Sequence, residues 1–190
     1  MHEEYHVPLA ELEMRFAELD PSPVDGGEVA MIVRRPATLE REVLEVGEFD
    51  LQEGLKGDNW RARGSRHTPD GSAIPDAQVA LMNVRLLDLL AGTRERWALA
   101  GDQLLVDLDL SSENLPPGTQ LAIGSAILEV TAQPHNGCAK FLERFGRDAL
   151  AFISSPARKQ LRLRGIYAKV IQTGSIRSGD LIQKVLVPAS

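Results

Sequence analysis

The chain of 190 residues contains one cysteine, Cys138, in the segment TAQPHNGCAKFLERFG (131–146). The preceding PHNG is typical of a loop and the following AKFLERFG has the periodicity of an amphipathic helix, so we expect the thiol at a helix start. The free N–H groups of the first helical turn, together with Lys140 and Arg144, favour the thiolate. A thiolate can attack an electrophile, carry sulfur as a persulfide or bind a soft metal. The alternative is a small apolar side chain that only fills space.

A run of basic residues follows the cysteine. Between positions 140 and 164, only Glu143 and Asp148 are acidic. The basic residues in the same interval are Lys140, Arg144, Arg147, Arg158, Lys159, Arg162 and Arg164. This local excess of positive charge predicts an anionic ligand near the thiol. The solvated face of an ordinary helix would give the same pattern.

A second group of candidate side chains lies in KGDNWRARGSRHTPDGSAIPD (56–76). This segment carries Asp58, Arg61, Arg63 and His67 among glycines and prolines, which predicts a long loop. Loops of this length within a compact domain are often functional, although disordered segments have the same composition.

Two other kinds of cysteine site are conceivable. His135 and Cys138 form an H-x-x-C pair, but a zinc site would need His67 or distant carboxylates to complete it. A Cys–His hydrolase would need His67 or His135 as its base, and no protease nucleophile motif surrounds Cys138. The glycines form neither of the common nucleotide-binding loops.

Composition narrows the partners and the compartment. A net charge of -6 argues against non-specific nucleic-acid binding, which depends on many contacts from lysine and arginine to phosphate. No apolar run approaches the roughly 20 residues that span a bilayer, and the start MHEEYHVP is unlike a signal peptide. A lone cysteine cannot form an internal disulfide and is typical of a reducing compartment. We therefore expect a cytoplasmic protein with no nucleic-acid and no membrane partner.

Apolar periodicity predicts the elements that position these side chains. Helices are expected over 8–19, over 83–91 with Asn83 as its cap, and over 138–163. Eight short apolar stretches predict strands: EVAMIVRRP, REVLEVGEF, DAQVALMN, DQLLVDLDL, TQLAIG, AILEVTAQ, YAKVIQTG and DLIQKVLV. Gly124 and Ser125 predict a tight antiparallel hairpin. Strands of this number and length predict a mainly β fold, a mostly antiparallel barrel with a few flanking helices.

The strand predicted in QLLVDLDL shows which face is buried. Its residues Leu104, Val106, Leu108 and Leu110 fall on one face, and Leu105, Asp107 and Asp109 fall on the other. The barrel domain is expected over 28–190, and residues 1–27 are expected to form a helical extension packed on it.

An ordered series of motifs resembles the MOSC domain, named for the C-terminal part of molybdenum cofactor sulfurase. The series is EGLKGD, DAQVALMN, SSENLPPGTQLAIGSAILEVTAQ, HNGCAKFLERFG and RLRGIYAKVIQTGSIRSGD, from about Gly54 to Ile182. The resemblance implies a barrel like the β-barrel domain of pyruvate kinase, which agrees with the strands predicted above. It also implies a bound molybdenum cofactor (molybdopterin), whose phosphate would suit the basic segment.

The resemblance assigns roles to particular residues. Cys138 corresponds to the family cysteine that ligates molybdenum or carries sulfur, and Asn114, Asp58 and the pair Arg164–Gly165 correspond to other family motifs. Lys140, Arg61, Arg63 and His67 are added here as cofactor-binding candidates on electrostatic grounds. Two positions depart from the family pattern, because Gly137 stands where many relatives have proline and the histidine of the G-D-x-H motif is delayed to His67.

The expected function is therefore that of a stand-alone MOSC protein. The leading hypothesis is a terminal component of a reductase that acts on a small N-hydroxylated substrate, with Cys138 as the metal ligand. A sulfur carrier that holds a persulfide on Cys138 and a non-catalytic module that binds an anion or a partner protein are the alternatives. The chain has no room for the pyridoxal-phosphate desulfurase domain of the sulfurase, and one cysteine cannot hold an iron–sulfur cluster. A separate electron donor or cysteine desulfurase is thus the expected partner.

Overall fold

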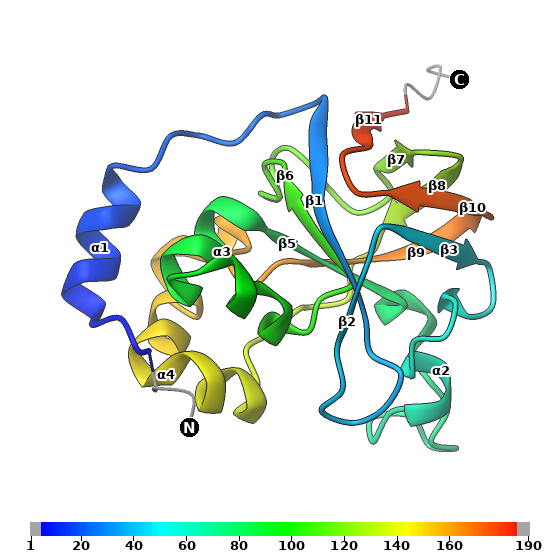
Figure 1. Ribbon diagram of the computed structural model, residues 1–190, viewed down its shortest axis with the longest axis horizontal. Helices are drawn as coiled ribbons and strands as arrows, with labels where there is room; N and C mark the ends of the chain where they lie inside the picture. The colour runs from blue at the N-terminus through cyan, green and yellow to red at the C-terminus, as the bar shows by residue number, and fades with distance from the viewer. Residues whose placement is uncertain (1–4, 186–190) are drawn as a thin grey trace.

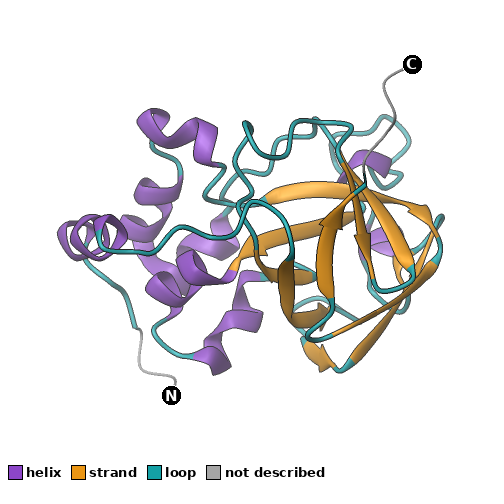
Figure 2. Ribbon diagram, turned by 90° about the horizontal axis from the view of Figure 1, so that it is seen from above, coloured by secondary structure: helices purple, strands orange, loops and turns teal. Residues whose placement is uncertain are grey.

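A computed structural model, which describes residues 5–185, shows a closed β-barrel with most of its helices gathered at one side (Figures 1 and 2). Around the barrel the strands follow the order β11-β7-β8-β9-β5-β6-β1, and β1 pairs again with β11. Their bounds are β1 Gly27–Arg34, β5 Val79–Asn83, β6 Leu104–Asp107, β7 Gln120–Ile123, β8 Ala126–Val130, β9 Ile166–Gln172 and β11 Leu181–Lys184. Only the pair β5–β6 is parallel, so the mostly antiparallel barrel is confirmed.

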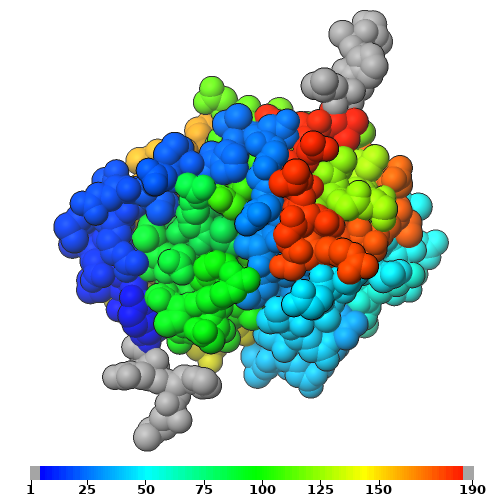
Figure 3. Space-filling model, turned by 45° about the horizontal axis from the view of Figure 1, so that its top comes forward, coloured from blue at the N-terminus to red at the C-terminus, as the bar shows by residue number. Residues whose placement is uncertain are grey.

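The ring closes through a short contact between its first and last strands. Gly27 pairs with Ile182 and Glu28 with Leu181, and β11 then passes to β7 on its other side. The space-filling view shows the red C-terminal strand lying directly against the blue β1 (Figure 3).

Four further strands complete the described β structure. β2 (Glu42–Leu44) pairs with the C-terminal end of β1, at residues 32–34. β3 (Val46–Asp50), β4 (Gly54–Leu55) and β10 (Gly174–Arg177) form a small separate sheet. The predicted strand REVLEVGEF is therefore two strands, β2 and β3, that belong to different sheets.

The two faces of the barrel wall bury different cores. Leu104, Val106, Leu108 and Leu110 lie in the apolar barrel interior, as their alternation predicts. Leu105, on the other face, is equally buried but packs in a second core between the barrel wall and the helices. The wall is thus apolar on both sides where helices cover it, which explains why β5 has the pattern VALM instead of strict alternation.

Most of the helices lie on one side of the barrel. The α-helices are α1 (Leu9–Ala17), α2 (Trp60–Arg63), α3 (Val84–Ala91) and α4 (Ala139–Ile153), and the 3-10 helices are η1 (Pro75–Ala77), η2 (Arg94–Ala100) and η3 (Pro156–Leu161). The helices α1, α3, α4 and η2 form the layer that covers this wall, and α2 lies apart from them (Figure 1). The Asn83 side chain caps α3 by accepting a hydrogen bond from the backbone N–H of Leu86 at 3.0 Å, as expected. The helix predicted over 138–163 divides into α4 and η3, and Gly146, with φ of 89°, kinks α4 itself.

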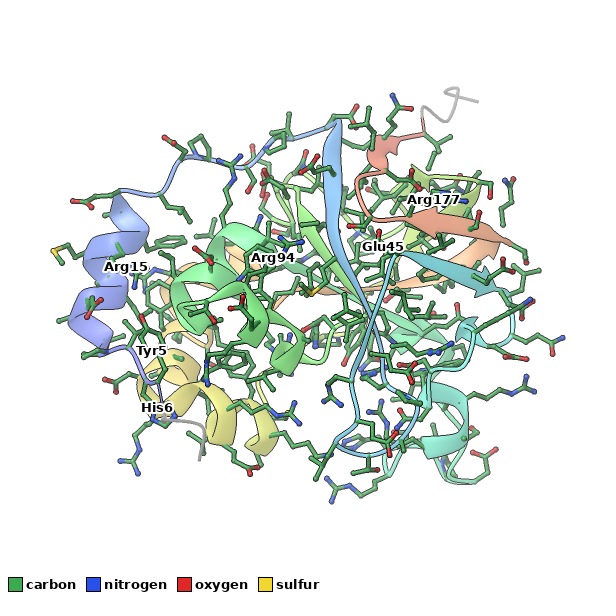
Figure 4. The ribbon with its side chains drawn as sticks, viewed as in Figure 1. Tyr5, His6, Arg15, Glu45, Arg94 and Arg177 are labelled. Atoms are coloured by element: carbon green, nitrogen blue, oxygen red, sulfur yellow. The ribbon has the colours of Figure 1, made fainter. Side chains whose placement is uncertain are left out.

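The N-terminal segment packs against the other helices. α1 contacts α3 and α4, and its inward residue Leu12 is completely buried. Figure 4 shows Tyr5 and His6 beside these helices, where a Cβ at Gly146 would lie 2.8 Å from Cγ of His6. Within residues 5–185, none of the helices combines the length and the apolar character needed to cross a bilayer.

Candidate functional site

Cys138 lies where the chain leaves the barrel and starts α4. It is the N-cap residue of the helix, with extended backbone (φ -123°, ψ 173°), and its carbonyl accepts a hydrogen bond from the N–H of Leu142 at 3.0 Å. The side chain is exposed. The predicted position of the thiol at a helix start is therefore confirmed, and its exposure argues against a space-filling role.

The thiol lies at a cavity of about 160 Å³ built by segments distant in sequence. The loop between β1 and β2, the helix α2, the loop before Cys138, the first turns of α4 and the start of β9 all contribute residues. Six of the lining side chains are cationic: Arg35, Arg41, Arg63, Lys140, Arg144 and Arg164. None of the described residues that line the cavity is acidic.

Two buried carboxylates, which do not line the cavity themselves, hold two of these arginines in place. Asp58, whose side chain is fully buried, accepts hydrogen bonds from Nε and Nη2 of Arg35 at 2.8 and 2.7 Å. Burial alone would raise the pKa of Asp58, but the hydrogen bonds and the charge of Arg35 hold this pKa below its ordinary value. Arg35 also donates to the Gly101 carbonyl at 2.9 Å, so its guanidinium has a fixed orientation.

Asp102 holds Arg164 in the same manner. Nη1 of Arg164 donates to both carboxylate oxygens, at 3.0 and 2.8 Å, and the guanidinium lies over the Phe141 ring at 5.0 Å from its centroid. Burial raises the pKa of Asp102, and the charge of Arg164 opposes this rise. The remaining four cations of the cavity have no carboxylate within 4.0 Å in the described part of the chain.

These unpaired cations repel one another. Burial and the charges of Arg144 and Arg35 lower the pKa of Arg41 from 12.5 to about 10, which still leaves it charged at neutral pH. Burial and the charge of Arg35 likewise lower the pKa of Arg63. An anion in the cavity would relieve this repulsion.

Unsatisfied polar atoms also converge on this cavity. Within residues 5–185, four buried side-chain atoms lack a hydrogen-bond partner: Nε of Arg41, Oδ1 of Asn59, Nδ1 of His135 and Nε of Arg164. All four residues line the cavity at Cys138. Because a buried polar atom left unpaired costs about 1–3 kcal/mol, such atoms are uncommon in proteins, and their convergence indicates a binding site for a polar ligand.

His135 and Tyr167 form another wall of the cavity. The His135 side chain is only 6% exposed and its ring stacks on Tyr167 with the centroids 4.2 Å apart. Its Nδ1 lies 3.6 Å from Oδ1 of Asp102, which is too long for a hydrogen bond. Burial, and then the charges of Arg164 and Arg35, lower the pKa of His135 well below 6.5, so the ring is neutral at pH 7.

A larger cavity of about 610 Å³ adjoins the first. The loop before Cys138, the end of α4, η3 and the start of β9 surround it, and His135, Asn136 and Arg164 line both cavities. Of these three residues, His135 and Arg164 each carry an unpaired buried nitrogen atom.

The structure brings together some of the predicted site residues. Cys138, Arg63, Lys140 and Arg164 line the same cavity, and Asp58 lies behind Arg35 instead of facing the space. Gly165 lines the larger, adjoining cavity.

Three predicted residues lie elsewhere. Arg61 is exposed on α2 and reaches Gln52 at 3.5 Å, and His67 is exposed in the loop that follows. The amide of Asn114 donates to the carbonyls of Val24 and Asp109 at 3.0 and 2.7 Å, and its oxygen accepts from Lys184 at 2.6 Å. These bonds tie the 109–114 loop to other segments, and none of these three residues lines either cavity.

The sequence reading assigned no ligand-binding role to Arg35, Arg41, Asn59 or Tyr167, and considered His135 only for zinc or hydrolase chemistry. The available signal was RRP at the end of a predicted strand, because cations directly after a strand often stand at the rim of a barrel. No group of three or more His, Cys, Asp or Glu side chains that could hold a metal occurs in the described residues, so the zinc alternative finds no support there.

Comparison with solved structures identifies the same fold in other proteins. The YuaD protein from Bacillus subtilis is 15% identical with a TM-score of 0.60, covering 83% of this chain and 94% of that one. YiiM from Geobacillus stearothermophilus is 15% identical with a TM-score of 0.52, over 84% of this chain and 75% of that one. YiiM from Escherichia coli is 17% identical with a TM-score of 0.53, over 86% and 72% of the respective chains.

A search of curated proteins found no match. The MOSC domain family model, in contrast, matches residues 70–183, which include β5 to β10, the whole of α4 and the cysteine at its start. This match spans more than half of the chain, and the chain belongs to the MOSC domain family.

Proposed function

We propose that the protein binds molybdenum cofactor at the cavity beside Cys138 and serves as the terminal component of a reductase for N-hydroxylated compounds. The supporting observation is that the only thiol, six cationic side chains and all four unpaired buried polar atoms of the described residues belong to this one cavity. Soft thiolate for the metal and guanidinium groups for a phosphate are the donors that this cofactor requires.

Each part of the cavity would have a separate task. Cys138 supplies the sulfur ligand, and its exposure keeps the adjacent position open to a substrate. Arg41, Arg63 and Lys140 neutralise the phosphate, while Arg35 and Arg164 are held in place by their buried carboxylates. When bound, the cofactor supplies a metal that exchanges two electrons with the substrate. Cleavage of the N–O bond consumes two electrons, from a separate donor protein, and two protons, and releases water.

The exposure of Cys138 also supports a second candidate, a sulfur carrier. An accessible thiol beside cations can receive a persulfide sulfur from a cysteine desulfurase and pass it on. In this case the anionic acceptor, not a permanently bound cofactor, would occupy the cationic cavity.

Metal analysis and intact mass distinguish these functions in protein purified from cells that make molybdenum cofactor. We expect about one molybdenum per chain in the wild type and none in Cys138→Ser, because a hydroxyl is a poor ligand for a soft metal. Since Cys138 is exposed, the free energy of unfolding should change by less than about 0.5 kcal/mol. A sulfur adduct of about 32 Da without molybdenum would favour the carrier, and neither result would favour a non-catalytic binding module.

The two arginines of α2 provide a matched pair for the anion-binding role. Arg63→Ala should weaken cofactor retention about tenfold or more, because it removes a cation that lines the cavity. Arg61→Ala removes an equal charge from the same helix but from a side chain outside the cavity, and should retain the wild-type molybdenum content. Equal losses in both variants would contradict the proposed location of the phosphate.

A further inference from the structure

His135 supplies the one imidazole among the described residues that line the cavity, and its buried Nδ1 has no hydrogen-bond partner there. Its ring is held between the two cavities, against Tyr167 and beside Gly165, where a Cβ would lie 3.3 Å from Nδ1. The nearest carboxylate, Asp102, is 3.6 Å from Nδ1 and is already bonded to Arg164. The imidazole therefore has no anion of its own in the folded protein.

Burial first, and then the positive charges around the ring, keep His135 unprotonated by lowering its pKa. Arg164 and Arg35 both disfavour the imidazolium, and Arg41, Arg63, Lys140 and Arg144 line the same cavity. Asp102 and Asp58 supply the only nearby negative charges among the described residues, and each is matched by an arginine. Tyr167 and Cys138 complete the set of titratable groups around the space.

We propose that the cavity at Cys138 is a proton-coupled oxyanion site, in which a bound oxyanion and a proton on His135 are taken up together. The anion neutralises the cations that oppose the imidazolium and supplies the negative charge that the ring lacks. The proton comes from solvent, and no covalent bond other than the new N–H bond forms. This inference deepens the proposed function, since it rests on the anionic ligand and assigns the coupling to a residue of this chain.

The direction of the pH dependence follows from linkage. His135 is neutral in the free protein at pH 7 because its pKa is well below 6.5, and the anion raises that pKa in the complex. Between the two pKa values only the complex holds the proton, so affinity for the anion falls as pH rises, approaching about tenfold per pH unit. Above the pKa of the complex the dependence disappears.

Sulfate is a suitable probe, because its charge is constant between pH 5 and 8. Calorimetric titration of the cofactor-free full chain, in buffers of different ionisation enthalpy, measures both affinity and proton uptake. We expect uptake that approaches one proton per sulfate near pH 6, with affinity that decreases as pH rises. Absence of proton uptake, or no sulfate binding up to about 50 mM, where the binding free energy would already be weaker than about 2 kcal/mol, would overturn the proposal.

Five variants locate the proton and the anion. His135→Gln should bind sulfate without proton uptake, whereas His67→Gln, at an exposed histidine outside both cavities, should behave as wild type. Cys138→Ser removes the sulfur as another group that could exchange a proton in the cavity and should retain the coupling. Arg63→Ala should weaken binding and Lys159→Ala, which alters only the larger cavity, should not. Proton uptake that persists in His135→Gln would show the proposal to be wrong. Sulfate binding that is weakened by Lys159→Ala but not by Arg63→Ala would also show this.

Direct observation of the ring provides a test that does not depend on a folded variant. In wild-type protein, the NMR signals of His135 should move from the neutral to the protonated position on addition of sulfate near pH 6. An unchanged ring signal at saturating sulfate would disprove the coupling. Molybdenum content tests the proposed cofactor binding, whereas proton uptake with sulfate tests the role of His135. Each proposal can therefore fail while the other holds.

Discussion

At the scale of single residues, the cavity owes its shape to charges that are buried behind it. Asp58 and Asp102 have fully buried side chains, and each orients one arginine toward the space. A buried ion pair contributes little net stability, but removal of one partner leaves an uncompensated charge. Asp58 therefore matters to ligand binding through the position of Arg35, not through contact with the ligand.

Replacement of Asp58 tests this description. Asp58→Ala should lower the free energy of unfolding by about 3–5 kcal/mol, because Arg35, whose side chain is 12% exposed, keeps its charge without a partner. The control is Glu48→Ala, which breaks an exposed pair with Lys56 and should cost less than about 1 kcal/mol. Urea unfolding of both variants gives the comparison, and similar midpoints would contradict a structural role for the Asp58–Arg35 pair.

At the scale of elements, a turn between η3 and β9 sets the distance between the cavity wall and β5. Gly165 has φ of 106°, and a Cβ there would lie 2.1 Å from the Leu81 carbonyl oxygen. The backbone can approach β5 this closely only without a side chain. Arg164 directly precedes Gly165 in this turn, and Nδ1 of His135, from the loop before α4, would lie 3.3 Å from a Cβ at Gly165.

Two glycine substitutions distinguish the energetic cost of backbone strain from the cost of the steric contact with β5. Gly118 also has positive φ, 91°, but nothing lies within 4 Å of a Cβ built on it. Gly118→Ala should cost about 1–3 kcal/mol from strain alone. Gly165→Ala should cost clearly more, in thermal or urea unfolding, because Leu81 must also move. If both variants lose the same free energy of unfolding, the contact between the new Cβ and the Leu81 carbonyl oxygen adds no cost of its own.

The elements were more predictable from sequence than the site. The hairpin at Gly124, the cap at Asn83 and the alternation through Leu104 and Val106 are local patterns, and the structure confirms all of them. Lys140 was accessible to prediction because it stands close to Cys138 in sequence. Arg35 and Arg41 come from a loop about a hundred positions away, and no local pattern encodes that approach.

Charge clustering in sequence was a weaker guide for the same reason. Of the basic run after the cysteine, Lys140, Arg144 and Arg164 reach the cavity. Arg158 instead pairs with Glu13 and lies over Phe152, at 4.6 Å from the ring centroid, where it joins η3 to α1. Whether a cation serves a ligand or joins two helices depends on tertiary packing, which adjacent positions in the chain do not reveal.

At the scale of the whole molecule, charge is distributed unevenly. The chain carries a net charge of -6, yet the described cavity has six cations and an acid-free lining. Acidic residues are therefore concentrated away from the cavity, where they do not neutralise the site. An anionic ligand would experience attraction mainly at the cavity, where burial limits screening by salt.

The pairing of β1 with β11 means that the barrel can close only after the segment that contains β11 has been synthesised. The closing contacts join Gly27 to Ile182, so the ring stays open until nearly the last described residues leave the ribosome. Closure by such distant segments is slow, and it leaves the edge of β1 exposed to chaperones or to other nascent chains in the meantime. A chain that ends at Arg177 lacks β11 and should therefore remain sensitive to protease and bind no sulfate. The 190-residue chain should resist protease and bind sulfate. Early resistance to protease in the shortened chain would show that the other strands fold without the last one.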